Sequence, residues 1–318
     1  MIAAYKNSPF MNFLIILTLI VGLLVIVEIS LRVLFGFGNP LVYIPDSDCG
    51  YLLAPNQTVR RFGNRIEINQ YSMRSPAIAP IPPTSTLRIL LLGDSIANGG
   101  WWTNQPDTIS EIIARLLRQK NHSNVEVLNA SANSWGPQNE LAYLQKFGHF
   151  GAQILVLLIN TDDLFAKIPS SLVVGRDRNY PDRKPPSAII ELCSRHLFPV
   201  AKFPEIETQT SKRGDIVGDN LEAIGKIQTI ATSANAQFVL AMTPLLREIS
   251  DRSPRDYEIQ ARNRLTEFTQ TEQIIYLDFL PIFNSIQQPT NLYRDNIHLS
   301  PQGNQLVSET ISLLTVNS

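Results

Sequence analysis

Three side chains in this 318-residue sequence have the types and the placement that nucleophilic chemistry requires. Ser95 directly follows an apolar run, at a turn where a helix would begin with its first backbone N–H groups free. Asp295 and His298 lie three residues apart, just before a Ser-Pro pair that suits the start of a helix. On a tight turn, the carboxylate can hold one imidazole nitrogen while the other nitrogen serves as a base. Taken singly, Ser95 is also compatible with an ordinary turn serine, and His298 with a structural histidine.

The elements that must position these residues follow from the pattern after residue 84. Predicted strands cover 87–92, 125–128, 154–159, 238–242 and 274–280, and predicted helices cover 107–119, 137–149, 219–234, 255–270 and 301–315. Strands that are apolar almost throughout are typical of a parallel sheet that helices bury on both faces. We therefore predict an α/β fold, a three-layer α/β/α domain with a five-stranded parallel sheet. Ser95 then lies at the carboxyl end of the first strand, the edge where such sheets bind ligands.

Two sequence blocks resemble a known enzyme family. The segment LLGDS, which ends at Ser95, and the segment DNIHLSPQG, which begins at Asp295, resemble the first and last blocks of the SGNH (GDSL) hydrolases. The likeness in strand order covers about residues 85–318. It implies a flavodoxin-like domain with Ser95 as nucleophile, His298 as general base and Asp295 as the residue that orients the imidazole, without a metal or organic cofactor. The elbow of the common α/β-hydrolases is disfavoured, because its G-x-S-x-G pattern fails at Ala97.

The middle blocks depart from the family pattern. In NASANSWG, Ser134 stands where the family has its oxyanion glycine, so we expect its backbone N–H to remain a donor and Gly136 to take over the conformational role. In NTDD, which resembles the family's G-x-N-D, Asp162 replaces the amide donor, and a carboxylate there would oppose a developing oxyanion. If the preceding strand continues, Asn160 shares a face with Asp162 and could supply the missing donor.

Four further residues lie beside these blocks. Asp94 and Asp163 are better explained as acceptors that cap turns than as catalytic acids. Trp101 and Trp102 follow Ser95 closely and are interpreted either as packing residues or as a platform for a sugar ring.

The N-terminal segment is long enough to cross a membrane. Apolar residues run from 13 to 27 and resume after Glu28, which as a helix would span about 37 Å. Glu28 and Arg32 would face each other four residues apart and lower the cost of insertion. A cleaved signal peptide and a buried helix are the alternatives, although no A-x-A cleavage site follows. Because Lys6 precedes the span and acidic residues follow it, we expect a single-pass membrane protein with its catalytic domain outside the cytoplasm.

These features divide the chain into a membrane anchor at 1–37, a juxtamembrane extension at 38–84 and an SGNH hydrolase-like domain at 85–318. The extension is rich in turn signals, with one predicted strand at 65–69, and has too little apolar material for its own core. We expect it to pack on the domain that follows. Within that domain, the proline-rich insertion at about 165–218 is either a lid or binding loop, or disordered.

Composition excludes several other classes. With 27 Lys and Arg against 28 Asp and Glu, the net charge is −1, so we do not expect nucleic acid as a partner. Hydrophobic residues make up 44% of the chain, which allows a sizeable core and excludes global disorder. Cys49 and Cys193 are far apart without metal-ligand spacing, so a zinc site has no support, and a disulfide between them is left open.

Together these features predict a membrane-anchored serine esterase that hydrolyses an O-acyl ester on a small molecule, a glycan or a lipid. One alternative uses the same triad to transfer the acyl group to a sugar hydroxyl instead of water. A second alternative, motivated by the altered middle blocks, is a non-catalytic glycan-binding module. The expected partners are the acylated substrate and the membrane.

Overall fold

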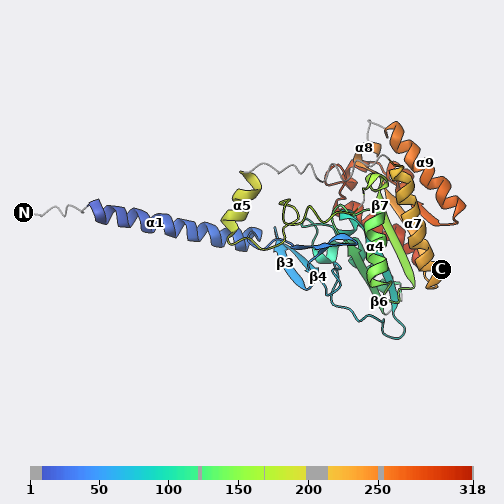
Figure 1. Cartoon of the computed structure of the whole chain (residues 1–318), viewed down its shortest axis with the longest axis horizontal. Coiled ribbons are helices and arrows are strands. Elements are labelled where there is room, and N and C mark those ends of the chain that lie inside the picture. The colour runs from blue at the N-terminus through green and yellow to red at the C-terminus, as the bar shows by residue number, and fades with distance from the viewer. Residues whose placement is uncertain (1–8, 121–123, 168, 198–213, 250–253, 317–318) are drawn as a thin grey trace, which may run out of the picture.

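The computed structural model describes residues 9–120, 124–167, 169–197, 214–249 and 254–316. A long apolar helix, α1 (Pro9–Ser30), projects from the body of the molecule and continues into a π-helical turn, η1 (Leu31–Phe35) (Figure 1). This helix is exposed and is long and apolar enough to cross a membrane, a property that anchors and signal sequences share. Lys6, on which the predicted orientation depends, lies outside the described residues.

The body is built on a five-stranded parallel sheet. Its strands are β5 (Leu87–Gly93), β6 (Val125–Ser131), β7 (Ile154–Asn160), β8 (Gln237–Thr243) and β9 (Ile275–Asp278). They pair in the order β6-β5-β7-β8-β9, and every pair is parallel. The connections reverse direction at β5, and in such flavodoxin-like sheets ligands bind beyond the carboxyl ends of the strands at this point.

Helices cover both faces of this sheet, so the predicted three-layer α/β/α class is confirmed. The longer helices are α3 (Ile109–Gln119), α4 (Pro137–Phe147), α7 (Ile216–Ser233), α9 (Asp256–Thr271) and α11 (Pro301–Val316). The shorter ones are α2 (Ser95–Asn98), η2 (Gln105–Asp107), η3 (Thr161–Phe165), α5 (Ala188–His196), α8 (Leu246–Ile249), α10 (Phe279–Asn284) and η4 (Pro289–Leu292).

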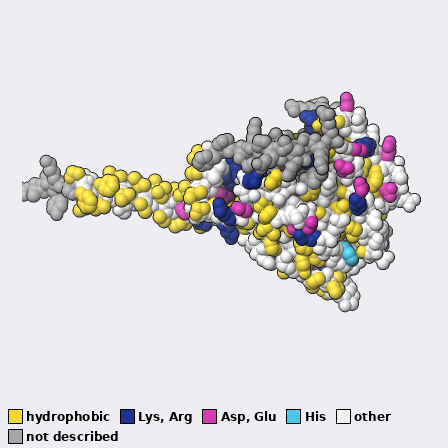
Figure 2. Space-filling model, viewed as in Figure 1, with side chains coloured by type: hydrophobic (Ala, Val, Ile, Leu, Met, Phe, Trp, Pro, Cys, Tyr) yellow, Lys and Arg dark blue, Asp and Glu magenta, His cyan; other side chains and the backbone are white. Residues whose placement is uncertain are grey.

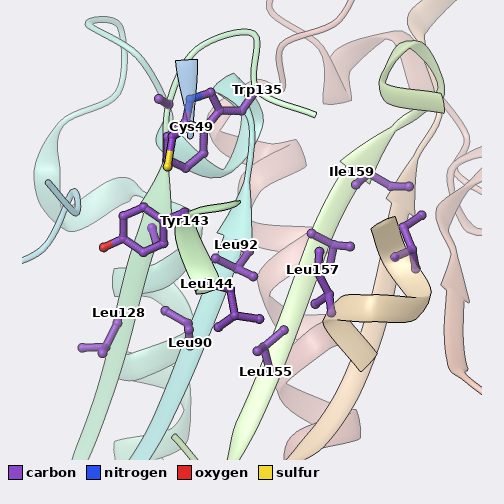
Figure 3. Close-up of a cluster of buried hydrophobic side chains, with 14 of the residues drawn as sticks. Cys49, Leu90, Leu92, Leu128, Trp135, Tyr143, Leu144, Leu155, Leu157 and Ile159 are labelled. Atoms are coloured by element: carbon purple, nitrogen blue, oxygen red, sulfur yellow. The ribbon is translucent and has the colours of Figure 1, made fainter. Parts of the chain in front are cut away.

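Alternate residues of each central strand enter two separate cores. Leu90 and Leu92 of β5 are buried with side chains of α4 and α7 on one face of the sheet (Figure 3). Ile89 and Leu91 are buried on the opposite face with side chains of α3 and α11. Because successive side chains of a strand point to opposite faces, a strand buried on both sides must be apolar at every position. This is the reason for the continuous apolar runs in the sequence.

One predicted strand has a different end in the structure. The apolar run at 274–280 forms β9 only as far as Asp278, and Phe279 begins α10. Asp278 caps this helix, because its Oδ1 accepts the backbone N–H of Leu280 at 2.9 Å.

The extension folds into two antiparallel hairpins, in which β1 (Tyr43–Asp46) pairs with β2 (Gly50–Leu53) and β3 (Gln57–Arg61) pairs with β4 (Asn64–Ile68). Only β4 corresponds to the strand predicted at 65–69. Leu52, Ile66 and Met73 are buried in the same core as Leu90 of the sheet. The extension therefore packs on the sheet domain.

The insertion is partly described, because residues 198–213 lie outside the described chain. Its earlier part carries α5 and a series of turns around Tyr180. The ring of Tyr180 contacts the rings of Tyr43 and Tyr51 with centroid distances of 5.1 and 5.0 Å. This part of the insertion therefore packs on the extension. Cys193 of α5 and the distant Cys49 are both free thiols.

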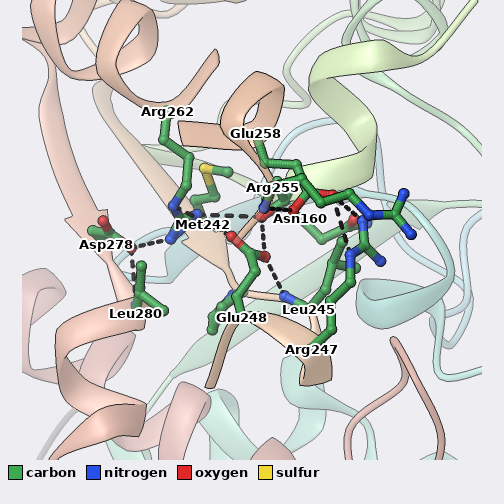
Figure 4. A network of polar contacts seen from close by, with 12 residues as sticks. Asn160, Met242, Leu245, Arg247, Glu248, Arg255, Glu258, Arg262, Asp278 and Leu280 are labelled. Carbon is green, nitrogen blue, oxygen red and sulfur yellow. Dashed lines mark hydrogen bonds and ion pairs between the residues drawn. The ribbon is translucent and has the colours of Figure 1, made fainter. Parts of the chain in front are cut away.

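A polar network fixes the loops at the carboxyl ends of β7, β8 and β9 (Figure 4). Glu248 accepts hydrogen bonds from the Thr161 hydroxyl and from the Leu245 backbone, both at 2.6 Å. Arg262 donates to Thr161 at 3.2 Å and to Asp278 at 2.8 Å. Because Glu248, Thr161 and Arg262 are buried, these bonds hold three neighbouring loops in one arrangement.

Candidate active site

Ser95 is positioned by the turn between β5 and α2. At Gly93 a Cβ atom would lie 2.6 Å from the carbonyl oxygen of Leu158, so only glycine allows the two strands to approach here. Asp94 then caps α2, because its Oδ1 accepts the N–H of Ile96 at 2.7 Å. Ser95 is the first residue of the helix, and its 8% exposed surface lines a cavity.

His298 and Asp295 reach Ser95 from the turn before α11. The Nε2 atom of His298 lies 3.0 Å from Ser95 Oγ, and Nδ1 lies 2.9 Å from Asp295 Oδ2. Partial burial would raise the pKa of Asp295, but hydrogen bonds from the backbone and side chain of His298 and the backbone N–H of Ile297 outweigh it and lower this pKa. An ionised Asp295 holds the proton on Nδ1, which leaves the Nε2 lone pair directed at the Ser95 hydroxyl. The structure thus brings together the three residues of the predicted triad.

The loop that carries Trp101 and Trp102, here called the aromatic loop, packs against the imidazole of His298. The Trp102 ring lies 4.3 Å from the His298 ring, and Trp101 contacts Trp102 edge to face at 5.7 Å. The guanidinium of Arg294 lies over both indoles, at 4.9 and 4.7 Å from their centroids. Both tryptophans line the cavity, so they are part of the site.

Arg74 holds the backbone of this aromatic loop through hydrogen bonds. The sequence around Arg74 contains no motif that predicts this role. Its fully buried guanidinium donates hydrogen bonds to the backbone carbonyls of Asn98, Gly100 and Thr103. Burial lowers the pKa of Arg74 to about 9. One side chain therefore fixes the chain at three points, from the last residue of α2 to the residue that follows Trp102.

The backbone N–H groups of Ser95 and Ser134 differ in their partners. The N–H of Ser95 bonds to the Asp94 carboxyl, whereas no donation from the N–H of Ser134 is seen among the described residues. Ser134 itself adopts the left-handed conformation, with φ of 59°, and its hydroxyl accepts a hydrogen bond from Tyr180 at 2.9 Å. Gly136 has φ of −142°, so the expectation that it takes over the conformational role was wrong. A side chain is excluded at Gly136 because its Cβ would lie 2.3 Å from Cβ of Ala166.

Asn160 does not supply the missing oxyanion donor, contrary to the expectation from sequence. Its fully buried amide donates to Asp94 Oδ2 at 2.9 Å and to Asp163 Oδ2 at 2.8 Å, so both amide hydrogens are used. β7 ends at Asn160, and Asp162 lies on η3 rather than on the same face of a strand. Asp162 is exposed, and its carboxylate lies 3.5 Å from Arg247. It therefore does not point a negative charge into the cavity lined by Ser95.

Behind the nucleophile lie three buried carboxyl groups. Burial raises the pKa of Asp94 to about 6 and raises those of Asp163 and Glu140 well above their usual range. Asp94 and Asp163 act as capping acceptors, for the N–H groups of Ile96 and Asn160 respectively. Both oxygens of Glu140 lack a hydrogen-bond partner among the described residues. The three groups repel one another when ionised, so the native fold favours their protonated forms.

The cavity in front of Ser95 has a volume of about 620 Å³. Besides Ser95, His298 and the tryptophans, its lining includes Asn133 and Ser134. Much of the remaining wall comes from the end of the anchor segment, through Phe37, and from the extension, through Tyr43, Arg61 and Phe62. The insertion contributes Arg178, Tyr180 and Arg195. Across the described ranges, no three His, Cys, Asp or Glu side chains are grouped as metal ligands.

Comparison with known proteins agrees with this geometry. The model of the GDSL-like lipase/acylhydrolase family matches residues 91–306, which is more than half of the chain. The chain belongs to this family. It is an ester-hydrolysing enzyme, and the resemblance noted in the sequence is confirmed.

Several solved structures are similar to this GDSL-family chain. An acetyl xylan esterase, AlAXEase, has 12% identity and a TM-score of 0.46, covering 72% of this chain and 99% of that one. A lipase/acylhydrolase from Enterococcus faecalis has 12% identity and a TM-score of 0.45, covering 72% and 95%. An acetylxylan esterase from Geobacillus stearothermophilus has 13% identity and a TM-score of 0.46, covering 72% and 93%. No curated protein sequence matches the chain.

The part of the site that the sequence does not reveal precedes the family segment of this GDSL-family enzyme. Phe37, at the end of the anchor segment, and Tyr43 and Phe62 of the extension all line the cavity. The available signal was aromatic residues recurring in a segment otherwise made of turn formers.

Proposed function

We propose that this protein is a serine esterase that hydrolyses an O-acyl ester, with Ser95 as the nucleophile. The observation that carries the proposal is the unbroken hydrogen-bonded series from Asp295 through His298 to Ser95, which ends in a cavity. A serine hydroxyl is a weak nucleophile until an oriented base accepts its proton, and this series supplies that base.

The proposed reaction has two steps. Ser95 Oγ attacks the acyl carbon while His298 Nε2 takes the hydroxyl proton, and Asp295 stabilises the resulting imidazolium. The N–H group of Ser134 holds the developing oxyanion. The alcohol leaves with the proton from His298, and a new ester joins the acyl group to Ser95 Oγ. Water then cleaves this ester with His298 again as base, which releases the carboxylic acid and restores the serine.

Labelling with a fluorophosphonate tests the nucleophile directly. We expect wild-type protein to become labelled and to hydrolyse p-nitrophenyl butyrate, and Ser95→Ala to lose both properties. Ser233→Ala, on the exposed end of α7, is the matched control and should behave as wild type. Equal labelling of wild type and Ser95→Ala would contradict the proposal.

Acyl transfer differs from hydrolysis only in the group that attacks the acyl-enzyme. We expect release of free acid to continue at the same rate when a sugar acceptor is added, without an acylated sugar product. An acylated sugar as the main product would favour the transferase alternative. A non-catalytic glycan-binding module is not supported, because the triad geometry is intact.

We also propose that α1 is retained as a membrane anchor, with the catalytic domain outside the cytoplasm. The end of the helix is bonded into the body of the protein, since Glu28 accepts the N–H groups of Ala188 and Ile189 at 2.8 and 3.0 Å. Cleavage of the helix as a signal peptide would remove these bonds. A tag before residue 9 should persist in the membrane fraction, and a C-terminal reporter should give an extracytoplasmic signal. Loss of the tag or a cytoplasmic reporter would contradict this topology.

A further inference from the structure

The last turn of α1 fixes where the membrane surface would lie. At about 1.5 Å per residue, the apolar part of α1 before Glu28 is about 28 Å long, close to the ~30 Å hydrocarbon core of a bilayer. Glu28 is the first charged residue of the described chain, and it pairs with Arg32 at 2.6 Å and caps the N-terminus of α5. A carboxylate with these partners belongs at the headgroup layer. The residues that follow, η1 and α5, then lie in this layer as well (Figure 1).

Part of the wall of the cavity in front of Ser95 is formed at this same level. Phe37, only two residues beyond η1, forms part of its wall, and so do Arg195 and His196 in the last turn of α5. Ile190 of α5 and Leu197, which follows the helix directly, are exposed, as apolar side chains of a helix lying on a membrane surface are. The entrance to the active site is therefore built by the segments next to the bilayer.

A line of aromatic rings leads from the end of the anchor to the catalytic base. Phe35 contacts Phe62 at 6.0 Å, Phe62 contacts Trp101 at 5.0 Å, Trp101 contacts Trp102 at 5.7 Å, and Trp102 contacts His298 at 4.3 Å. Phe35, Phe62 and Trp101 are 41%, 46% and 41% exposed, although aromatic side chains of this size are usually well buried. Exposed aromatic rings at this depth are typical of the membrane interface.

The charge of the cavity wall is positive. Arg61, Arg178 and Arg195 line it, and none of its described lining residues is a carboxylate. Glu191 pairs with Arg61 and Arg195 at 3.0 and 2.9 Å, so these two guanidinium groups share one carboxylate. Figure 2 shows Lys and Arg side chains gathered at the base of the apolar helix, in a chain whose net charge is only −1. Guanidinium groups bind phosphate and carboxylate groups strongly, so this wall selects an anion.

We propose that the ester substrate is an anionic lipid of the membrane that holds α1, and this assignment rests on the proposed esterase function. Its acyl chain enters along the aromatic line from the bilayer, its acidic headgroup binds near Arg178 and Arg195, and its ester carbonyl reaches Ser95. A soluble acidic glycan would use the same arginines and could stack on the same tryptophans, but its binding would not require a cavity wall built beside the membrane anchor.

The experiment uses full-length protein in phosphatidylcholine vesicles. Release of fatty acid is compared for phosphatidylglycerol and phosphatidylcholine with identical acyl chains, presented at equal density. We expect kcat/KM to be at least about tenfold higher for phosphatidylglycerol, and the ratio to fall as salt is raised. Turnover of an acidic acetylated oligosaccharide at a higher kcat/KM than phosphatidylglycerol would overturn the assignment.

Variants locate the headgroup site. Arg178→Gln and Arg195→Gln should each lower the phosphatidylglycerol to phosphatidylcholine ratio about fivefold or more, and Arg195→Lys should restore much of it. Arg115→Gln, on α3 and outside the cavity wall, is the matched control and should keep the wild-type ratio. Melting curves identify any variant that fails to fold. In that case the salt dependence of the wild-type phosphatidylglycerol to phosphatidylcholine ratio tests whether a charged headgroup is recognised.

The same assays separate the two proposals. If wild type is labelled by fluorophosphonate and hydrolyses p-nitrophenyl butyrate but shows no preference for phosphatidylglycerol, the lipid assignment fails while the esterase stands. If no ester is hydrolysed and no label is taken up, the proposed function fails first.

Discussion

Glu140 on α4 gives the sharpest test of the buried carboxyl groups behind the nucleophile. It is fully buried, and neither of its carboxylate oxygens has a hydrogen-bond partner among the residues described. Burial raises the pKa of Glu140 well above its usual range, and the charge of Asp94 raises it further. The unfolded chain releases this proton near pH ~4.3, whereas the native state keeps it to a higher pH. Between these two pKa values the native state therefore binds one more proton than the unfolded state.

The sign and size of the effect follow from this proton. An extra proton in the native state makes the free energy of unfolding fall as pH rises, by about 1.4 kcal/mol per pH unit from this group. Glu140→Gln keeps the shape and removes the titration. We expect the free energy of unfolding of the variant, relative to that of wild type, to rise by up to about 3 kcal/mol between pH ~5 and pH ~7. The buried Asp94 and Asp163 titrate in both proteins, so their contribution largely cancels in the difference.

Urea unfolding of full-length protein in mild detergent, followed by tryptophan fluorescence at about pH 5, 6 and 7, measures this difference. Glu267→Gln, on the exposed side of α9, is the matched control and should give a difference that does not change with pH. A constant difference between wild type and Glu140→Gln across this range would refute the reasoning. It would mean that Glu140 is ionised in the native state and has a partner that compensates its charge.

Three other predictions concern the reaction and its support. Ser95→Ala and His298→Ala should each lower kcat about a thousandfold or more, and the double variant should be little worse, because the effects of groups that act as one unit are not additive. Steady-state kinetics measures these losses. Additive losses in the double variant would argue against a shared mechanism. Asn160→Leu should lower the melting temperature by several degrees, because about 1–3 kcal/mol is lost for each buried group left unpaired, and calorimetry that finds no change would contradict the bridging role. Asp162→Asn should leave kcat within about twofold of wild type, since its carboxylate is exposed and paired; a large gain would show that position 162 faces the oxyanion.

The sheet domain could be predicted because its signals are local. Each central strand is buried on both faces, so apolar runs mark β5, β7 and β8 directly. Ser300 and Pro301 indicate where α11 begins, and Ser300 Oγ does accept the N–H of Gly303 at 3.2 Å. These features depend on short stretches of sequence and not on distant partners.

The hairpins of the extension could not be predicted, because their stability comes from distant contacts. The turn between β3 and β4 places Phe62 and Gly63 at φ of 48° and 87°, the pattern of a tight primed turn. Phenylalanine rarely adopts this conformation, so no turn is predicted at this position from its residue type. Phe62 is held in place by the rings of Phe35 and Trp101, which lie far away in the sequence.

The pairing of the polar groups at Ser134 and Asn160 could not be predicted either, because it also depends on residues distant in the sequence. Ser134 adopts the conformation expected of glycine, and its hydroxyl is held by Tyr180 of the insertion. Asn160 is committed to two buried carboxyl groups whose positions depend on the whole fold. Local spacing identified the right segments but could not say which of their polar groups were already paired.

The triad and much of the wall of the cavity come from different parts of the chain. The triad lies within the segment that the family shares, at 91–306, whereas Phe37, Arg61 and Phe62 precede it and form a wall of the cavity. That wall is not a separable attachment, because the hairpins of the extension share one core with the sheet. Removing the extension would expose buried apolar surface of the sheet domain as well as open the cavity. We therefore expect changes to the core residues of the hairpins to alter both the cavity wall and the stability of the sheet domain.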